Sequence, residues 1–314
     1  MKLVSYTVDG QTRIGCLQGQ ELIDLNYAYR AMLESQGKVR ASHIAEAYVP
    51  ANMVEFLQGG EESMAAAEQA VDFALSNRKA LTRRTIFSVV DVKIEAPVLN
   101  PGKMICVGHN YREHILEMGR GIPPYPLIFA KFSNTIIGPQ DDIPHYTQLS
   151  DQLDYEAEFA FVIGKPARNV PQSEALQYIA GYTIVNDVTY RDLQRRTLQW
   201  LQGKTVEGAA PMGPWLVTSD ELSNPSGLDV RLTVNGEERQ HSNTENLVFT
   251  VPFLVEYLSS LMTLEPGDIV LTGTPGGVGV ARDPQTFLKD GDVVRIEIEG
   301  VGSLENRVRS QGGV

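Results

Sequence analysis

The chain has 314 residues, of which 42% are hydrophobic and 21% charged, so we expect a globular protein with a sizeable core. Its 27 basic and 39 acidic side chains give a formal net charge of −12, which argues against nucleic-acid binding because such a surface repels phosphate backbones. The two cysteines are far apart in sequence, so they form no disulfide framework. The polar N-terminus does not resemble a signal peptide, and no apolar run approaches the ~18 residues of a membrane span. We therefore expect a cytoplasmic protein that does not contact a membrane.

Residues 1–96 are predicted to form a small α+β domain. Two strands are expected at 2–8 and 13–18, joined by an Asp9-Gly10 turn. Helices are expected near 27–37 and 61–82, the second rich in alanine. The stretch from Ala96 to Gly102 contains two prolines and is typical of a linker, so residues 97–314 are predicted to form the second domain.

The second domain is rich in predicted strands. Apolar or alternating runs predict them at 104–108, 127–131, 156–163, 181–186, 214–217, 229–234, 268–272, 292–298 and 303–308. Helices are predicted at 110–118, 173–179 with Ser173 as N-cap, 188–202 and 251–262. Because strands and helices do not alternate regularly, a doubly wound parallel sheet is disfavoured. We expect the α+β class, with a mixed, mostly antiparallel roll or barrel.

Two glutamates, Glu156 and Glu158, lie two residues apart in an otherwise apolar strand. Side chains alternate across a strand, so both point to the same face, where burial costs several kcal/mol unless a cation compensates. Asp187 follows the next apolar strand and can complete the set. Three carboxylates without histidine or cysteine favour Mg²⁺ or Mn²⁺, with Ca²⁺ as a further hard cation. Spacing alone equally allows two solvated glutamates and an aspartate that caps a helix.

A histidine and a glutamate, His114 and Glu117, are spaced i, i+3 on the predicted helix 110–118. They therefore share a face, and a carboxylate that orients a histidine makes a general base. Glycines at both ends would let this helix act as a lid over a ligand. Taken alone, the spacing favours the simpler alternative, an exposed ion pair.

Further polar side chains stand in apolar company. Arg191, Arg195 and Arg196 form the densest basic group, part of which we interpret as a clamp for a small anion. Lys131, Lys204, Gln194 and the turn residue Thr274 are the other candidates for a pocket that binds an anionic, metal-chelating ligand. Each one alone is better explained as a surface residue.

Taken together, these motifs resemble the fumarylacetoacetate hydrolase superfamily. The resemblance is strong over 97–309 and loose over 1–96, and looks closest to the branch of acylpyruvate hydrolases and oxaloacetate decarboxylases with an extra N-terminal domain. Its carriers are Gly108-His109-Asn110-Tyr111 with His114 and Glu117, Asp154-Tyr155-Glu156-Ala157-Glu158, Asn186 to Gln194, Gly203-Lys204, Asn235 to Gln240, and Thr272-Gly273-Thr274-Pro275. Several motifs in the right order make the resemblance specific.

The resemblance implies a role for each candidate. Glu156, Glu158 and Asp187 would bind Mg²⁺ or Mn²⁺, while His114, Glu117 and Lys204 would be catalytic. The substrate-binding residues would be Arg191, Gln194, Thr274, Lys131, Tyr111 and Gln240. It also implies a β-rich roll, a homodimer and a small anionic 2-oxo acid as substrate. At the position of His109, relatives often carry a basic or another residue, which leaves a part in specificity or no role open for it. The N-terminal domain receives no role.

The leading functional hypothesis is hydrolysis of a C–C bond in a 2,4-dioxo acid, with water activated by His114 and the pyruvate enolate stabilised by the metal and Lys204. Oxaloacetate decarboxylation, or isomerisation of a hydroxymuconate-type dioate, would use the same enolate chemistry without an attacking water. A hypothesis from another class is a non-catalytic protein that binds 2-oxo acids. The presence of both His114 and Glu117 argues against it, because a protein that only binds its ligand needs no base. The sequence does not separate the enzymatic alternatives.

Overall fold

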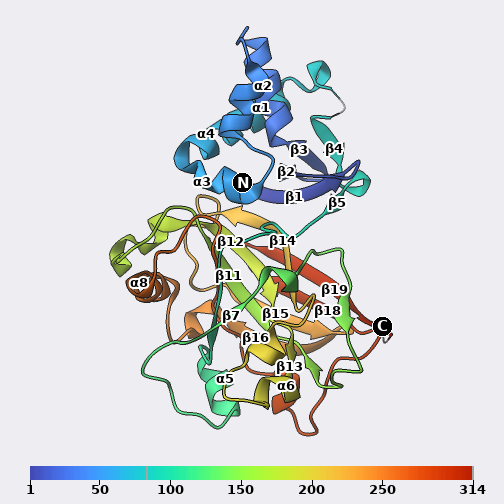
Figure 1. The fold of residues 1–314 in the computed structure, drawn as a ribbon, viewed down its shortest axis with the longest axis vertical. Helices are drawn as coiled ribbons and strands as arrows, with labels where there is room; N and C mark the ends of the chain where they lie inside the picture. Colours follow the sequence, from blue (N-terminus) through green and yellow to red (C-terminus); the bar gives the residue numbers. More distant parts are fainter. Residues whose placement is uncertain (83, 313–314) are drawn as a thin grey trace.

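The computed structural model describes residues 1–82 and 84–312 and shows a mixed, sheet-rich α+β fold (Figure 1). The α+β class predicted from the sequence is therefore confirmed. The described strands form one large, one small and one five-stranded sheet, and they do not close into a barrel. None of the helices in the described part of the chain is both long and apolar enough to cross a membrane.

The N-terminal part pairs a small sheet with a layer of helices (Figure 1). Its strands are β1 (Lys2–Val8), β2 (Gln11–Gln18), β3 (Glu21–Asp24), β4 (Ile86–Ser88) and β5 (Lys93–Ile94). Its helices are α1 (Leu25–Ser35), α2 (Ala41–Tyr48), α3 (Met53–Gln58) and α4 (Gly60–Ser76). The Asp9-Gly10 turn is confirmed, with both residues at positive φ as a tight hairpin requires. The helix predicted at 61–82 instead ends at Ser76, and the short helices α2 and α3 were not predicted.

The large sheet continues from the N-terminal part into the rest of the chain. Its order is β4-β3-β2-β1-β14-β12-β11-β17-β6-β7, and the junction is the antiparallel pairing of Leu3 with Leu216. The added strands are β6 (Met104–Gly108), β7 (Leu127–Lys131), β11 (Ala157–Ile163), β12 (Ile179–Asn186), β14 (Ala210–Thr218) and β17 (Ile269–Leu271). Only β6 and β17 pair in parallel within this order, so the sheet is mixed and mostly antiparallel.

A five-stranded sheet packs against the large sheet and encloses the main core. It consists of β16 (Glu237–Asn243), β15 (Asp229–Val234), β18 (Val293–Ile298), β19 (Gly302–Ser310) and β9 (Ile143–His145). Phe159 and Tyr182 of the large sheet stack at 5.2 Å and share a buried cluster with Leu232 and Ile296 of the second sheet. Helix α8 (Val251–Leu261) covers the same cluster with its apolar face. This core fixes the ends of β11 and β12.

The helix predicted at 188–202 is wrong as a single element. The chain instead forms β13 (Thr189–Tyr190), α6 (Arg191–Arg195) and α7 (Leu201–Lys204). Residues 189–190 form a strand rather than a helix because β13 pairs with β10 (Leu153–Asp154). In addition, the N–H of Arg191 donates to the carbonyl of Gln152. Tertiary hydrogen bonds thus override helical propensity at the start of the segment.

Two smaller predictions need correction. The segment predicted as a helix at 173–179 is a 3-10 helix, Gln172–Tyr178, and its N-cap is Pro171 rather than Ser173. Helix α5 (Arg112–Glu117) is shorter than the predicted 110–118. It starts late because the amide side chain of Asn110 bonds the backbone of Phe249 and Thr272, which holds that residue outside the helix. The remaining short elements are β8 (Ile136–Ile137) and 3-10 turns at Arg78–Ala80, Val89–Asp91, Ser133–Thr135, Thr244–Asn246 and Gly279–Ala281.

Candidate active site

Three buried carboxylates meet where the hairpin of β11 and β12 ends. Ala157 pairs with Asn186, and the N–H of Asp187 donates to the carbonyl of Glu156, so the residues beyond the paired strands face one another. Glu156, Glu158 and Asp187 each offer an oxygen within 4.8 Å of the others. They are 5%, 1% and 0% exposed, so the alternative of solvated glutamates does not describe this structure.

The negative charge of this carboxylate triad is only partly compensated by the protein. Burial, together with Asp187 and Glu156, raises the pKa of Glu158 well above its ordinary range, although the N–H of Gly273 donates to its carboxylate at 2.7 Å. Burial would also raise the pKa of Glu156, but Lys204 and Arg191 outweigh it and hold that pKa well below its ordinary range. Glu158 is thus the carboxylate that most lacks a cation.

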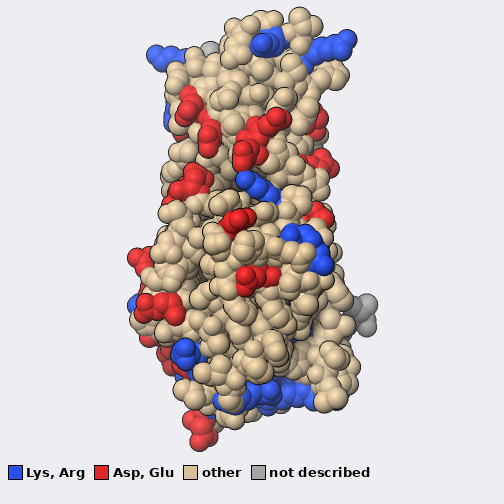
Figure 2. Space-filling view, turned by 90° about the vertical axis from the view of Figure 1, so that its left-hand side faces the viewer, with Lys and Arg blue, Asp and Glu red and all other residues tan. Residues whose placement is uncertain are grey.

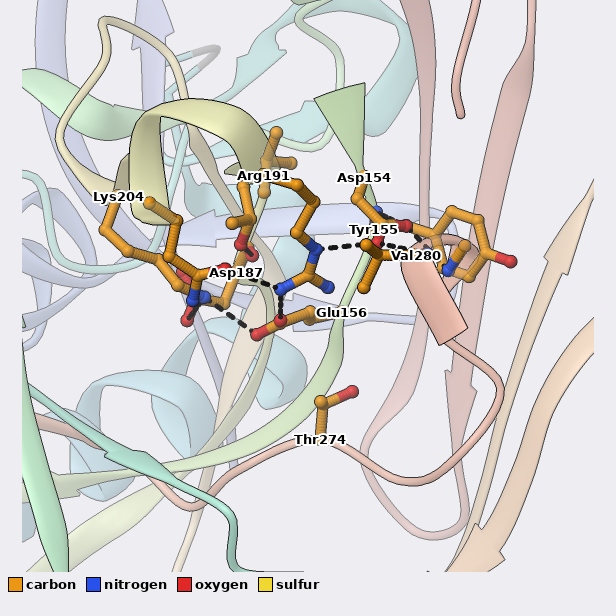
Figure 3. A network of polar contacts seen from close by, with 12 residues as sticks. Asp154, Tyr155, Glu156, Asp187, Arg191, Lys204, Thr274 and Val280 are labelled. Atoms are coloured by element: carbon orange, nitrogen blue, oxygen red, sulfur yellow. Dashed lines mark hydrogen bonds and ion pairs between the residues drawn. The ribbon is translucent and has the colours of Figure 1, made fainter. Parts of the chain in front are cut away.

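Two buried lysines hold the two oxygens of Asp187. The Nζ of Lys204 donates to Asp187 at 2.7 Å and to Glu156 at 2.8 Å (Figure 3). The Nζ of Lys131 lies 2.7 Å from the other Asp187 oxygen and donates to the carbonyl of Val188. Because both ammonium groups are fully enclosed, each would be costly without its carboxylate partner. Lys131 therefore fixes Asp187 from behind, whereas Lys204 reaches into the triad.

Arg191 links the triad to a fully buried aspartate, Asp154. Its guanidinium contacts Asp154 through Nε at 2.7 Å and Glu156 through Nη1 at 2.7 Å (Figure 3). Asp154 also accepts the N–H groups of Gly279 and Val280, so it anchors Arg191 to the loop after β17. The Nη2 of Arg191 has no partner among the described residues, which leaves one donor for a ligand.

His114 and Glu117 form a close pair rather than an exposed ion pair. The Nδ1 of His114 lies 2.7 Å from Glu117 Oε1, and the N–H of Gly277 donates to Glu117 Oε2 at 2.8 Å. His114 is only 6% exposed. Because Glu117 accepts the proton on Nδ1, the Nε2 of His114 carries the lone pair, which is the arrangement of a general base.

Glu156 and Glu158 of the triad line one small cavity of about 60 Å³ together with His114. Seven of the residues singled out from the sequence line it: His114, Glu156, Glu158, Arg191, Gln194, Lys204 and Thr274. Asp187, Lys131, Glu117, Tyr111 and Gln240 are not among the lining residues. Gln240 instead bonds Ala157, Thr274 and Pro275, so its place is to hold the Thr274 turn.

Eight lining residues were not assigned to the site from the sequence. They are Val107, Gly108, His109, Met118, Arg120, Phe129, Arg195 and Trp200. Arg195 carried a signal as part of the dense basic group, and Gly108 and His109 belong to a motif that carries the family resemblance. Trp200 and Phe129 look like ordinary core residues in sequence, and their rings meet edge-on at 5.3 Å in the cavity wall.

The donor set fits a hard divalent cation. All three candidate ligands are carboxylates, and the described part of the chain brings no histidine or cysteine ligand into the cluster. A cation there would also compensate Glu158, whose carboxylate accepts only the Gly273 N–H among the residues that the structure describes. Buried carboxylates at this density, next to a cavity, are typical of catalytic metal sites.

Comparison with known proteins agrees with this site. Residues 103–309 match the family described as fumarylacetoacetate (FAA) hydrolase C-terminal. The chain is 43% identical over 278 residues to "Oxaloacetate tautomerase fahd2, mitochondrial" of Xenopus laevis, covering 88% of this chain and 84% of that protein. It is 37% identical over 295 residues to "Oxaloacetate tautomerase YisK" of Bacillus subtilis, covering 93% and 94%.

Solved structures share the whole architecture. A fumarylacetoacetate hydrolase from Exiguobacterium antarcticum superposes with a TM-score of 0.79 at 34% identity, covering 99% of this chain and 100% of that one. A maleylpyruvate hydrolase from Sphingobium, in complex with manganese(II) and pyruvate, superposes with a TM-score of 0.73 at 27% identity, covering 99% and 100%. With the family match over two thirds of its length, this chain belongs to the fumarylacetoacetate hydrolase superfamily.

Proposed function

We propose that this protein is a divalent-metal-dependent oxaloacetate tautomerase, which interconverts the enol and keto forms of that acid. The observation that carries the proposal is one small cavity lined by one base, His114, and by two carboxylates of the triad, Glu156 and Glu158. The two relatives named as oxaloacetate tautomerases support this choice of substrate and reaction. Within the superfamily it replaces C–C hydrolysis, which the sequence put first, with an isomerisation on the same site.

Glu156, Glu158 and Asp187 would hold the cation, with Mg²⁺ and Mn²⁺ as the candidates. When bound, such a cation polarises the 2-oxo group and stabilises negative charge on its oxygen. The manganese(II) and pyruvate in the Sphingobium structure support this assignment. Lys204 and Arg191 keep Glu156 ionised, which a metal ligand must be.

The chain's own residues supply the proton transfer. In the keto-to-enol direction the Nε2 of His114 accepts the proton from C3 and passes it to the C2 oxygen. In the reverse direction it takes the proton from the enol O–H and returns it to C3, while Glu117 stabilises the imidazolium that forms. The Nη2 of Arg191 and the side chain of Gln194 are placed to bind the substrate carboxylate next to the triad. No water is consumed, so the site needs only to position the acid and move one proton.

Hydrolysis of a 2,4-dioxo acid remains the second candidate, and one observation favours it. The His114–Glu117 pair can equally activate water, and the similar Sphingobium structure is a maleylpyruvate hydrolase. A non-catalytic binder of 2-oxo acids is less well supported, because binding alone needs no base held by Glu117 and Gly277. The homodimer and the cytoplasmic location stay predictions.

A substrate panel separates these reactions. Purified protein with Mg²⁺ or Mn²⁺ is given enol-oxaloacetate, keto-oxaloacetate and an acylpyruvate, and the enol absorbance, released carbon dioxide and released pyruvate are measured. We expect faster loss of the enol signal without matching carbon dioxide, and little cleavage of the acylpyruvate. Release of pyruvate from the acylpyruvate at a higher kcat/KM than tautomerisation would instead establish the hydrolase.

A further inference from the structure

The cavity is lined by buried carboxylates at its floor and by exposed arginines at its mouth. Glu156 and Glu158, which line the floor, are 5% and 1% exposed. Arg120 and Arg195 line the same cavity but are exposed side chains, so they stand at its opening. A ligand that reaches the triad therefore passes, or remains in contact with, these two cations.

The two arginines at the mouth form no ion pair with a carboxylate of the described residues. Among residues 1–82 and 84–312, neither Arg120 nor Arg195 has a carboxylate within 4.0 Å, whereas the deeper Arg191 is paired with both Asp154 and Glu156. Figure 2 shows Lys and Arg side chains gathered at the end of the molecule where α5 and α6 lie in Figure 1. Arg195 is the last residue of α6, and Arg120 follows the end of α5 at Glu117 by three residues. On a chain of net charge −12, a basic mouth attracts anions to this cavity.

His109 adds a buried polar group between floor and mouth. It lines the cavity, is 9% exposed, and neither ring nitrogen has a partner in the described part of the chain. Its ring stacks on His114 at 5.5 Å and meets the edge of Trp200 at 5.5 Å, which fixes its direction. Its φ of +53° is a left-handed conformation that is strained for a residue with a side chain, and leaving a buried ring nitrogen without a hydrogen bond adds a second cost. A ligand that hydrogen-bonds to His109 would recover the second cost.

The charge state of His109 suits an anion that is also held by the arginines. Burial, with His114 and Arg120 nearby, lowers the pKa of His109 to about 4. The neutral ring then offers one N–H donor without adding a third positive charge to the mouth.

We propose that His109, Arg120 and Arg195 form a second anion subsite, which binds the distal carboxylate of a 2-oxo dicarboxylate while the 2-oxo acid end lies at the triad. The inference rests on the proposed 2-oxo acid chemistry of the same cavity and deepens it. It makes these residues determinants of specificity: dicarboxylates are preferred over monocarboxylates of equal length. Two carboxylates at opposite ends of one ligand match a cavity that has cationic groups at both ends.

The test compares two four-carbon acids that differ in the distal carboxylate. Oxaloacetate and 2-oxobutyrate are titrated by calorimetry into the Mg²⁺-loaded protein, with fresh oxaloacetate at low temperature. Arg120→Gln and Arg195→Gln remove one mouth cation each. Arg112→Gln and Arg196→Gln are the matched controls, because both are exposed arginines on the same two segments that do not line the cavity. His109→Asn is a third variant, since asparagine tolerates the left-handed backbone.

We expect the wild type to bind oxaloacetate at least about tenfold more tightly than 2-oxobutyrate. Arg120→Gln and Arg195→Gln should each weaken oxaloacetate binding about five- to tenfold and leave 2-oxobutyrate within about twofold, while both controls match the wild type. His109→Asn should likewise weaken only the dicarboxylate. Equal losses for the two acids, equal losses in the controls, or no loss in the arginine variants would each overturn the subsite, as would a wild type that binds neither acid.

The outcomes keep the subsite apart from the proposed reaction. A wild type that prefers the dicarboxylate through Arg120 and Arg195 but does not speed tautomerisation retains the subsite and loses the proposed function. Rapid tautomerisation with unchanged selectivity in both arginine variants retains the function and removes the subsite.

Discussion

The Nδ1 of His114 lies 2.7 Å from Oε1 of Glu117, and this contact joins α5 to the loop after β17, because Glu117 also accepts the N–H of Gly277. The base is therefore oriented by two segments of the chain, because Glu117 and Gly277 are 160 residues apart in sequence. Fixing the tautomer of His114 is what leaves its Nε2 free for proton transfer.

Replacing the base should remove turnover but not the cation site. His114→Asn is expected to lower kcat for oxaloacetate tautomerisation by about 10²- to 10⁴-fold, the usual contribution of a positioned base. Binding of Mn²⁺, measured by calorimetry, should change little because the triad keeps all three carboxylates. The exposed His43→Asn serves as the control and should behave as wild type. A parallel loss of Mn²⁺ affinity and turnover in His114→Asn would contradict the separate roles.

Neutralising Glu158 should have opposite effects with and without metal. In metal-free protein, Glu158→Gln relieves the repulsion that Glu156 and Asp187 exert on it, so the melting temperature should not fall and is expected to rise. Saturating Mg²⁺ stabilises the wild type, by about 2.7 kcal/mol at 100 times its Kd, and should fail to stabilise the variant. Thermal unfolding with Mg²⁺ and with chelator measures both effects, and the exposed Glu245→Gln is the control. Equal Mg²⁺ stabilisation of Glu158→Gln and wild type would remove Glu158 from the ligand set.

Lys131 should matter mainly for stability. Lys131→Met leaves one oxygen of buried Asp187 without its cation, which is expected to cost about 3–5 kcal/mol in the free energy of unfolding. The control is Lys93→Met, which breaks a half-exposed contact with Glu95 and Asp141 and should cost less than about 1 kcal/mol. Denaturant unfolding compares the two. A Lys131→Met protein as stable as Lys93→Met would show that Asp187 does not depend on this ion pair.

The neutral state of His109 predicts a pH dependence. Its pKa is lowered from 6.5 to about 4, chiefly by burial, so below pH 6.5 the unfolded chain binds a proton that the folded chain refuses. The free energy of unfolding should therefore fall as the pH drops from 6.5 to 4, and His109→Asn should show a smaller fall over that window. Urea unfolding at several pH values measures the difference between the two proteins. Parallel curves would mean that His109 titrates normally in the folded state.

Continuous apolar runs in the sequence allowed us to predict most of the strands and also the carboxylate triad. A strand that is buried on both faces has a continuous apolar run, as in β11 and β12, and carboxylates in such a run stand out because burial makes them costly. Glu156, Glu158 and Asp187 could thus be found without knowledge of the fold. The alternative interpretation, in which the two glutamates are solvated, could be rejected only once the structure showed that both are buried.

The parts that the sequence did not predict depend on tertiary contacts. Asp154 looks like an ordinary residue before a strand. It matters to the site because it pairs with Arg191 and accepts the backbone N–H of Gly279, which is 125 residues away in sequence. The break at 188–202 arises from pairing of β13 with β10, which no local pattern records. Trp200 and His109 become lining residues only because separate segments close one cavity around them.

The most direct test of the account is the rate of enol-to-keto conversion of oxaloacetate, followed by the enol absorbance. It is measured for the wild type with Mg²⁺, the wild type with chelator, and His114→Asn with Mg²⁺. The account predicts conversion well above the buffer rate for the first, and near the buffer rate for the other two. Conversion by His114→Asn at the wild-type rate, or by wild type in chelator at the rate seen with Mg²⁺, would contradict a metal-dependent tautomerase whose base is His114.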